Sequence, residues 1–173
     1  LRPGLPQEDD ARGDEDEARR EFVERPRHLV EHEDCLECRF LSICHGGCPV
    51  RTYSALGTFG QIPTLADKHD LNVTVGTWID TRLGRNQQEI ASAIKLAREH
   101  KNVVRVLIGN EVVLRADVPI EVMYEYLDRA REQIGQPVST AEPWHVWIKN
   151  PGLARHVDFI TVHLLPYWER VPV

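Results

Sequence analysis

The residues of this chain that could do chemistry fall into two groups, and the first is a tight run of cysteines. All four cysteines among the 173 residues lie at Cys35, Cys38, Cys44 and Cys48, in the spacing C-x2-C-x5-C-x3-C. This close spacing favours thiolates that converge on a metal ion or an iron–sulfur cluster. Two alternatives stay open: tetrahedral zinc, with His32 and His45 as spare ligands, and a disulfide pair, which the lack of a secretory signal disfavours.

The second group consists of aromatic side chains, carboxylates, an amide and an imidazole that follow apolar runs of the sequence. The apolar faces of sugar rings pack on aromatic side chains, and carboxylates act on glycosidic oxygens, so this combination is typical of a sugar-binding cleft. Each residue alone is more often rim packing or half of an ion pair, but four runs that end alike strengthen the case for a site. The group comprises Trp78, Asp80, Asn110, Glu111, Glu142, Trp144, His163, Tyr167 and Trp168.

The elements that must position these residues alternate between buried strands and amphipathic helices. The β-branched runs 72–79, 103–109, 137–142 and 158–165 predict strands. Residues 86–100 predict a helix with Asn86 as its N-cap, Glu89 three residues on, and an apolar face of Ile90, Ile94 and Ala97. A second helix is predicted at 119–135 and a short one at 151–156.

Strands separated by helices lie parallel, in either a doubly wound layer or a closed barrel. The chain contains neither of the two glycine-rich phosphate-binding patterns that would favour the doubly wound fold. The barrel is therefore the favoured architecture. In a barrel the carboxyl ends of the strands converge on one mouth, which would bring the second group together.

Several of these segments resemble glycoside hydrolase family 17, in its bacterial branch of β-1,3-glucan hydrolases and glucanosyltransferases. The matching stretches are RTYSALGTFGQIPTLADKH, LNVTVGTWI, VVRVLIGNEVVLR, PVSTAEPWHVW and VDFITVHLLPYWE, which run in order over about residues 50–173. The resemblance implies a (β/α)8 TIM barrel and a retaining mechanism. It implies Glu111 as the acid/base, with Asn110 beside it, and a β-glucan oligosaccharide as the ligand of Trp78, Glu142, Trp144, His163, Tyr167 and Trp168.

Strands two to six of that barrel are the ones the resemblance assigns to this sequence. Strand seven, which would carry the nucleophilic glutamate, is not among them, and neither are strands one and eight. Retaining hydrolysis needs two carboxyl groups about 5–5.5 Å apart, so we expect a partial barrel that is inactive alone. Its open sheet edges would favour self-association. The resemblance implies no cofactor for the hydrolase part.

Residues 22–51 resemble a different family, the SPASM-type C-terminal segment of radical S-adenosylmethionine enzymes that mature peptides or sulfatases. That resemblance implies auxiliary 4Fe-4S clusters on the cysteines, although the cysteines that would complete them, and the radical-generating C-x3-C-x2-C motif, are absent from the sequence. An iron–sulfur or zinc-binding module is accordingly the alternative function. The two resemblances meet at Val50 and Arg51, which indicates a fusion of two coding segments.

Composition and charge further limit the class of protein. Residues 1–34 hold 12 acidic and 6 basic residues, which accounts for the net charge of −6. We expect an acidic disordered leader at 1–21, a cysteine-rich segment at 22–49 and the partial barrel at 50–173. A basic footprint for nucleic acid is missing, no apolar run could cross a bilayer, and no signal peptide is seen, so the chain as written is expected in the cytoplasm.

Overall fold

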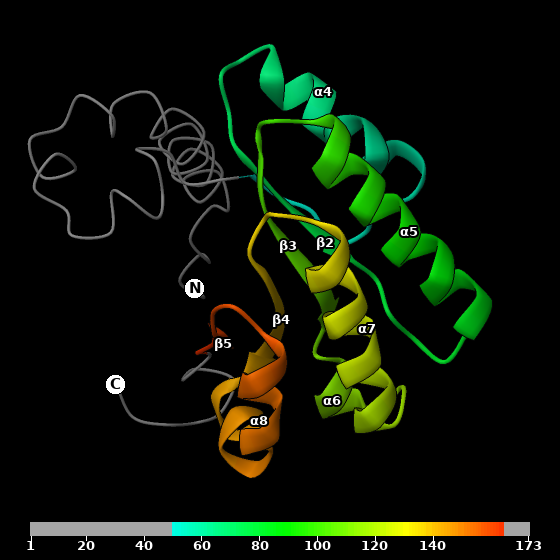
Figure 1. The fold of residues 1–173 in the computed structure, drawn as a ribbon, viewed down its shortest axis with the longest axis vertical. Helices are drawn as coiled ribbons and strands as arrows, with labels where there is room; N and C mark the ends of the chain where they lie inside the picture. The colour runs from blue at the N-terminus through cyan, green and yellow to red at the C-terminus, as the bar shows by residue number, and fades with distance from the viewer. Residues whose placement is uncertain (1–49, 165–173) are drawn as a thin grey trace, which may run out of the picture. The chain divides into compact units, whose positions relative to one another are not determined.

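The computed structural model of the protein describes residues 50–164, which form a single parallel sheet with helices in every connection (Figure 1). The strands are β1 (Val50–Arg51), β2 (Val73–Thr77), β3 (Val103–Asn110), β4 (Val138–Pro143) and β5 (Thr161–His163). They pair in the order β1-β2-β3-β4-β5, and every neighbouring pair is parallel.

The connections are helical. A 3-10 turn η1 (Gly57–Gln61) and α4 (Ile62–Asp67) join β1 to β2, and α5 (Leu83–Glu99) joins β2 to β3. Between β3 and β4 lie α6 (Val112–Arg115) and α7 (Ile120–Gln133), and α8 (Trp144–Lys149) with a second 3-10 turn η2 (Pro151–His156) leads to β5.

Sequential strand order is what distinguishes this sheet from a doubly wound one. A doubly wound sheet reverses direction and places helices on both faces, whereas here each strand is added beside the previous one. The large helices accordingly lie along one side of the strands in Figure 1. The five strands form part of a (β/α)8 barrel, which confirms the predicted fold class.

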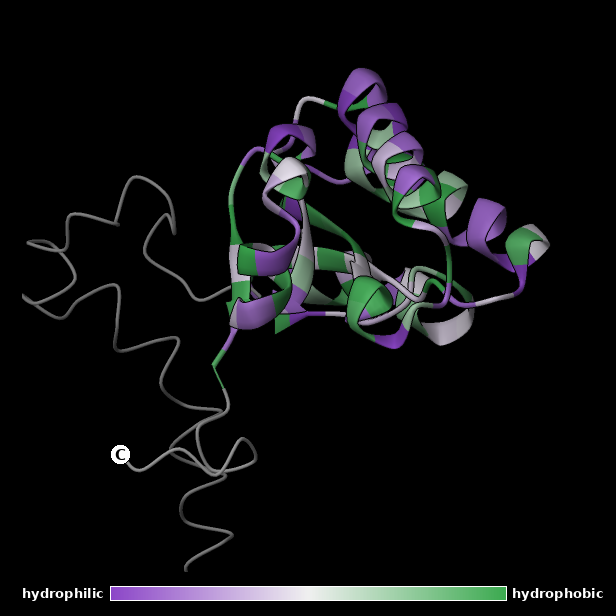
Figure 2. Cartoon of the chain, turned by 90° about the horizontal axis from the view of Figure 1, so that it is seen from below, coloured by the Kyte–Doolittle hydropathy of each residue, from purple (hydrophilic) through white to green (hydrophobic). Residues whose placement is uncertain are grey.

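The core lies between the sheet and these helices. Val75, Val106 and Ile108 of the strands meet Ile90 of α5 and Leu127 of α7, and all five are at most 1% exposed. Figure 2 shows hydrophilic and hydrophobic residues on the helices, as expected for elements that cover one side of a sheet. No helix within residues 50–164 is long and apolar enough to span a bilayer.

The predicted elements are present, with shifted ends. Asn86 is not the N-cap of α5, so that prediction is wrong: the helix begins at Leu83, and the Asn86 side chain is buried in its first turn. There the amide accepts a hydrogen bond from Asp80 N (3.0 Å) and donates one to Asp80 O (2.6 Å), which fixes the preceding loop. The last strand is shorter than predicted, and α6 and α8 were not predicted.

Candidate active site

The chain turns sharply at the carboxyl end of β3, and this turn places Glu111. Gly109 adopts φ +84°, and a Cβ there would lie 2.4 Å from Val112 Cγ2, so only glycine fits. Glu111 itself has φ 56° and ψ 31°, a left-handed conformation that is uncommon outside glycine. Non-glycine residues held in this region concentrate at functional sites, where the surrounding structure imposes the conformation.

The Glu111 carboxylate contacts an imidazole from another strand. Its Oε1 lies 2.7 Å from Nδ1 of His163, the last residue of β5, and its backbone N–H donates to Ala141 O of β4 at 2.7 Å. The side chain of Glu111 is 26% exposed and that of His163 is 18% exposed. Glu111 is thus held by two strands while part of its carboxyl group remains open to solvent.

Arg51, at the end of β1, lies beside Glu111 and His163. It donates to Asn110 Oδ1 at 2.7 Å, its Nη1 lies 3.4 Å from His163 Nε2, and its guanidinium covers the Tyr53 ring at 4.5 Å. Burial lowers the pKa of Arg51, while nearby Tyr53 and Glu111 act in the opposite direction. A guanidinium stays protonated at any physiological pH, so Arg51 contributes a fixed positive charge next to Asn110.

Glu142, on β4, is fully buried and has a structural partner. Its two carboxyl oxygens accept hydrogen bonds from the backbone amides of Val113 (2.9 Å) and Leu114 (3.2 Å) at the start of α6. Burial raises the pKa of Glu142, and the two amide hydrogen bonds oppose that rise. This carboxyl group therefore holds the turn that follows Glu111. Its predicted contact with substrate stays a prediction.

A groove opens beside this site, at the carboxyl ends of β1 and β2. It has a volume of about 500 Å³, and its aromatic walls come from Tyr53, Phe59 and Trp78, with Arg82 and Arg85 at the start of α5. Tyr53 is 48% exposed and Phe59 is 47% exposed. Sequence reasoning found Trp78 but missed Tyr53 and Phe59. An aromatic residue directly after RT at a strand end was the available signal for Tyr53.

Trp78 is connected to the Glu111 turn through Arg115. The Arg115 guanidinium lies 4.9 Å from the centroid of the Trp78 ring and donates to the backbone oxygens of Ile79 (3.0 Å) and Asn110. It also pairs with Asp117. The aromatic wall of the groove and the strand end that carries Asn110 and Glu111 are therefore held together by one side chain.

The structure gathers some of the other predicted site residues and leaves some untested. Asp80 follows β2 and is bound by Arg82, which lowers the pKa of Asp80 to about 2. Trp144 begins α8 and is 43% exposed, with its ring edge-on to that of His145. Tyr167, Trp168 and the four cysteines lie outside the described residues. Within residues 50–164 no cluster of metal-ligating side chains occurs, and the predicted cluster on the cysteines stays a prediction.

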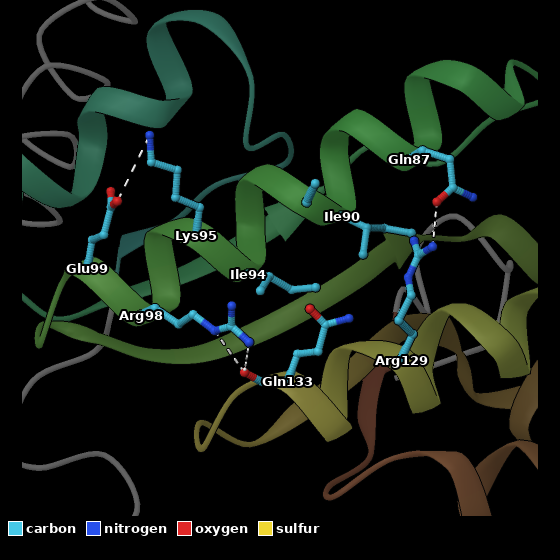
Figure 3. Close-up of a pocket in the computed structure, with 9 residues that line it drawn as sticks. Gln87, Ile90, Ile94, Lys95, Arg98, Glu99, Arg129 and Gln133 are labelled. Carbon is cyan, nitrogen blue, oxygen red and sulfur yellow. Dashed lines mark hydrogen bonds and ion pairs between the residues drawn. The ribbon is translucent and has the colours of Figure 1, made fainter.

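A second hollow, of about 440 Å³, lies between α5 and α7 on the outer helical layer (Figure 3). Two of its charged side chains, Arg98 and Arg129, join the two helices. Arg98 donates to Gln133 O at 2.7 and 3.0 Å, and Arg129 bonds Gln87 at 2.5 Å. This hollow is a seam between helices, and it contains none of the residues at the strand ends.

The protein family follows from a comparison of the whole sequence. The BtgE/BtgC glycoside hydrolase domain matches residues 41–173, which is most of the chain. The chain belongs to this glycoside hydrolase family. A glucan 1,3-beta-glucosidase of Schizosaccharomyces pombe is 27% identical over 118 residues, which cover 62% of this chain and 37% of that protein.

Two solved structures share the fold. The glycoside hydrolase family 17 β-1,3-glucanosyltransferase of Rhizomucor miehei has 24% identity and a TM-score of 0.62, and an active-site mutant of that enzyme in complex with laminaritriose has 22% and 0.61. Each alignment covers 71% of this chain and 48% of the solved chain. The chain thus spans about half the length of these structures and about a third of the yeast relative.

These findings confirm the predicted resemblance to glycoside hydrolase family 17. They give no support to the SPASM resemblance. The family match begins at residue 41, so Cys44 and Cys48 fall within the matched range, ahead of Val50, where the sequence predicts the barrel to begin. The predicted domain boundaries remain predictions.

Proposed function

We propose that this chain supplies the acid/base side of a retaining glycosidase or transglycosidase site for β-1,3-glucan. The observation that carries the proposal is Glu111, partly exposed at the end of β3, with Oε1 2.7 Å from His163 Nδ1. The family match and the relatives named for β-1,3-glucan chemistry support the substrate class.

In a complete site of this kind Glu111 first protonates the glycosidic oxygen of the departing sugar, while the nucleophilic carboxylate that the resemblance implies bonds to the anomeric carbon. Glu111 then takes a proton from water in hydrolysis, or from a sugar hydroxyl in transfer, as that oxygen displaces the nucleophile from the anomeric carbon. His163 engages Oε1 and leaves the second oxygen for this proton transfer. Arg51 orients the Asn110 amide, which is then placed to hydrogen-bond a sugar hydroxyl next to the reacting carbon.

The groove lined by Tyr53, Phe59 and Trp78 would hold the glucan, because the apolar faces of glucose rings pack on aromatic side chains. Trp144 and His163 would contact further parts of the same chain of sugars. The nucleophile implied for a seventh strand is not among the five strands described. We therefore expect the chain to bind glucan without cleaving it or transferring its sugars.

Titration of the 173-residue chain with laminaritriose tests the binding, with intrinsic tryptophan fluorescence and calorimetry as readouts and cellotriose as the β-1,4 control. We expect saturable binding of laminaritriose. Trp78→Ala should weaken this binding, and Tyr124→Ala should leave it unchanged. Tyr124 is a matched control because it stacks on His156, between α7 and η2. Equal affinity for both trisaccharides, or binding indifferent to Trp78→Ala, contradicts the proposal.

Chromatography of laminaritriose incubated with the chain tests the chemistry. No product above background is expected. Sustained cleavage that Glu111→Gln abolishes would overturn the proposed incompleteness while supporting the acid/base role. Cleavage that survives Glu111→Gln would overturn the role itself.

A further inference from the structure

Glu89 is a fully buried carboxyl group in the middle of α5. The sequence pattern indicated a capping residue for this helix, but the structure gives it a different task. Ser54 Oγ donates to Oε1 at 2.5 Å, and the backbone N–H of Ala55 donates to Oε2 at 2.8 Å. Both partners belong to the segment that leaves β1. A buried carboxyl group is costly unless its oxygens are bound, so this pairing is a specific attachment.

The same helix binds this segment at a second point. Ser92, one turn further along α5, donates to Ala55 O at 2.7 Å. Ala55 is therefore held by α5 through both its amide and its carbonyl. The Ser54 hydroxyl in turn accepts from Leu56 N at 3.2 Å. Residues 54–56, which precede η1, are fixed from the helical layer.

The opposite side of Tyr53 is fixed to the sheet. Thr52 N donates to Thr74 O at 3.1 Å, and Gly76 N donates to Thr52 Oγ1 at 3.0 Å. Tyr53 thus lies between an attachment to β2 and an attachment to Glu89, while its own side chain projects into the groove. The two attachments together determine where this aromatic wall stands.

β1 cannot set that position by itself. It is two residues long and registers with β2 only at Val50 with Val73 and Arg51 with Thr74. Strands in globular proteins usually have 3–10 residues, with about 5–6 most common, so two residues give little alignment. The groove wall that follows depends on hydrogen bonds from outside the sheet.

We propose that Glu89 is a positioning residue for the sugar groove. Its carboxyl group, which belongs to α5, holds residues 54–56 in place. Through these residues it sets the distance of Tyr53 and Phe59 from Trp78, and a glucan chain requires this distance. Glu89 touches no sugar and acts only through these residues. The sugar part of this inference rests on the proposed function, whereas the attachment of the groove wall does not.

The test compares Glu89→Ala with a matched variant at the other end of the sheet. Asn102→Ala also removes two side-chain hydrogen bonds, to Pro63 O (2.8 Å) and Leu71 O (3.2 Å), but these lie before β2 and β3, away from the groove. Glu89→Ala is expected to raise the dissociation constant for laminaritriose about tenfold, since two hydrogen bonds that set the site are lost. Asn102→Ala is expected to leave it unchanged.

Amide hydrogen exchange supplies a readout that does not depend on sugar. Glu89→Ala is expected to speed exchange at Ala55 and Leu56, with Asn102→Ala leaving both protected. Glu89→Gln, which keeps an acceptor oxygen for the Ala55 amide, is expected to restore most of the protection and affinity. Thermal unfolding of all three variants shows whether general loosening is comparable.

Every outcome of these experiments supports or contradicts the positioning role of Glu89. Equal losses of affinity in Glu89→Ala and Asn102→Ala, or an unchanged dissociation constant in Glu89→Ala, overturn the positioning role. Unchanged exchange at Ala55 and Leu56 overturns the attachment. If the unmodified chain fails to bind laminaritriose, the proposed function fails instead, and the exchange rates still decide whether Glu89 fixes the wall.

Discussion

Glu111 and His163 meet at 2.7 Å although 52 positions separate them in the sequence. The contact joins the carboxyl ends of β3 and β5 across the intervening strand β4. Three strands therefore have to be in register before the carboxyl group acquires its imidazole partner, and the contact reports on the assembly of the whole mouth.

A double-mutant cycle on Glu111→Ala and His163→Ala measures this contact. Both side chains are mostly buried, and hydrogen bonds to charged groups exceed neutral ones, so a coupling of about 1–2 kcal/mol in the free energy of unfolding is expected. Urea denaturation of the four proteins gives the value. Additive losses would show that the two side chains do not stabilise each other.

Gly76 should tolerate no side chain. A Cβ there would lie 2.1 Å from Thr52 O, so Gly76→Ala forces β1 away from β2 and is expected to lower the free energy of unfolding by about 1–3 kcal/mol. Gly84→Ala is the control, because nothing lies within 4 Å of its Cβ position and alanine favours the helix. Equal stability of the two variants in urea would contradict the close approach.

The buried Glu142 predicts a pH dependence. Its pKa is raised above the ordinary value of 4.5, so from pH 4.5 up to the raised pKa the folded chain binds more protons than the unfolded one. The free energy of unfolding therefore falls as the pH rises through this window. Glu142→Gln cannot ionise and should lack this slope.

Urea midpoints of the unmodified chain and Glu142→Gln, measured in steps upward from pH 4.5, check this sign. The difference between the two proteins removes the contributions of other titrating groups. A difference that stays constant with pH would mean that the amides of Val113 and Leu114 cancel the effect of burial on the pKa, and a difference that favours the unmodified chain as pH rises would mean that they outweigh it.

The local sequence predicted site residues where a polar side chain directly follows an apolar run. Asn110 and Glu111 come after a strand rich in β-branched residues, and His163 ends another, so their common edge could be predicted. The contact between Glu111 and His163 could not, because it depends on the pairing of β4 with β5. The strong helical and strand periods likewise predicted the parallel fold.

The remaining residues were hidden for physical reasons. Glu89 follows Asn86 at the spacing of a capping pair, yet its partner Ser54 is 35 positions away and only the tertiary fold brings them together. Arg51 belongs to a strand of two residues, which is too short to show a period. Such contacts are set by packing between elements and leave no local pattern.

The consecutive order of the strands has a consequence for how the mouth could be re-engineered. Each strand and the loop after it contribute one adjacent portion of the rim. A chimera of two relatives that is joined at the amino ends of the strands, for example just before β3, would therefore transfer a contiguous block of the rim. The aromatic half around Tyr53 and Trp78 and the half that carries Glu111 could then be recombined as separable modules, with the hydrogen bond of Arg51 to Asn110 as the junction that must be matched.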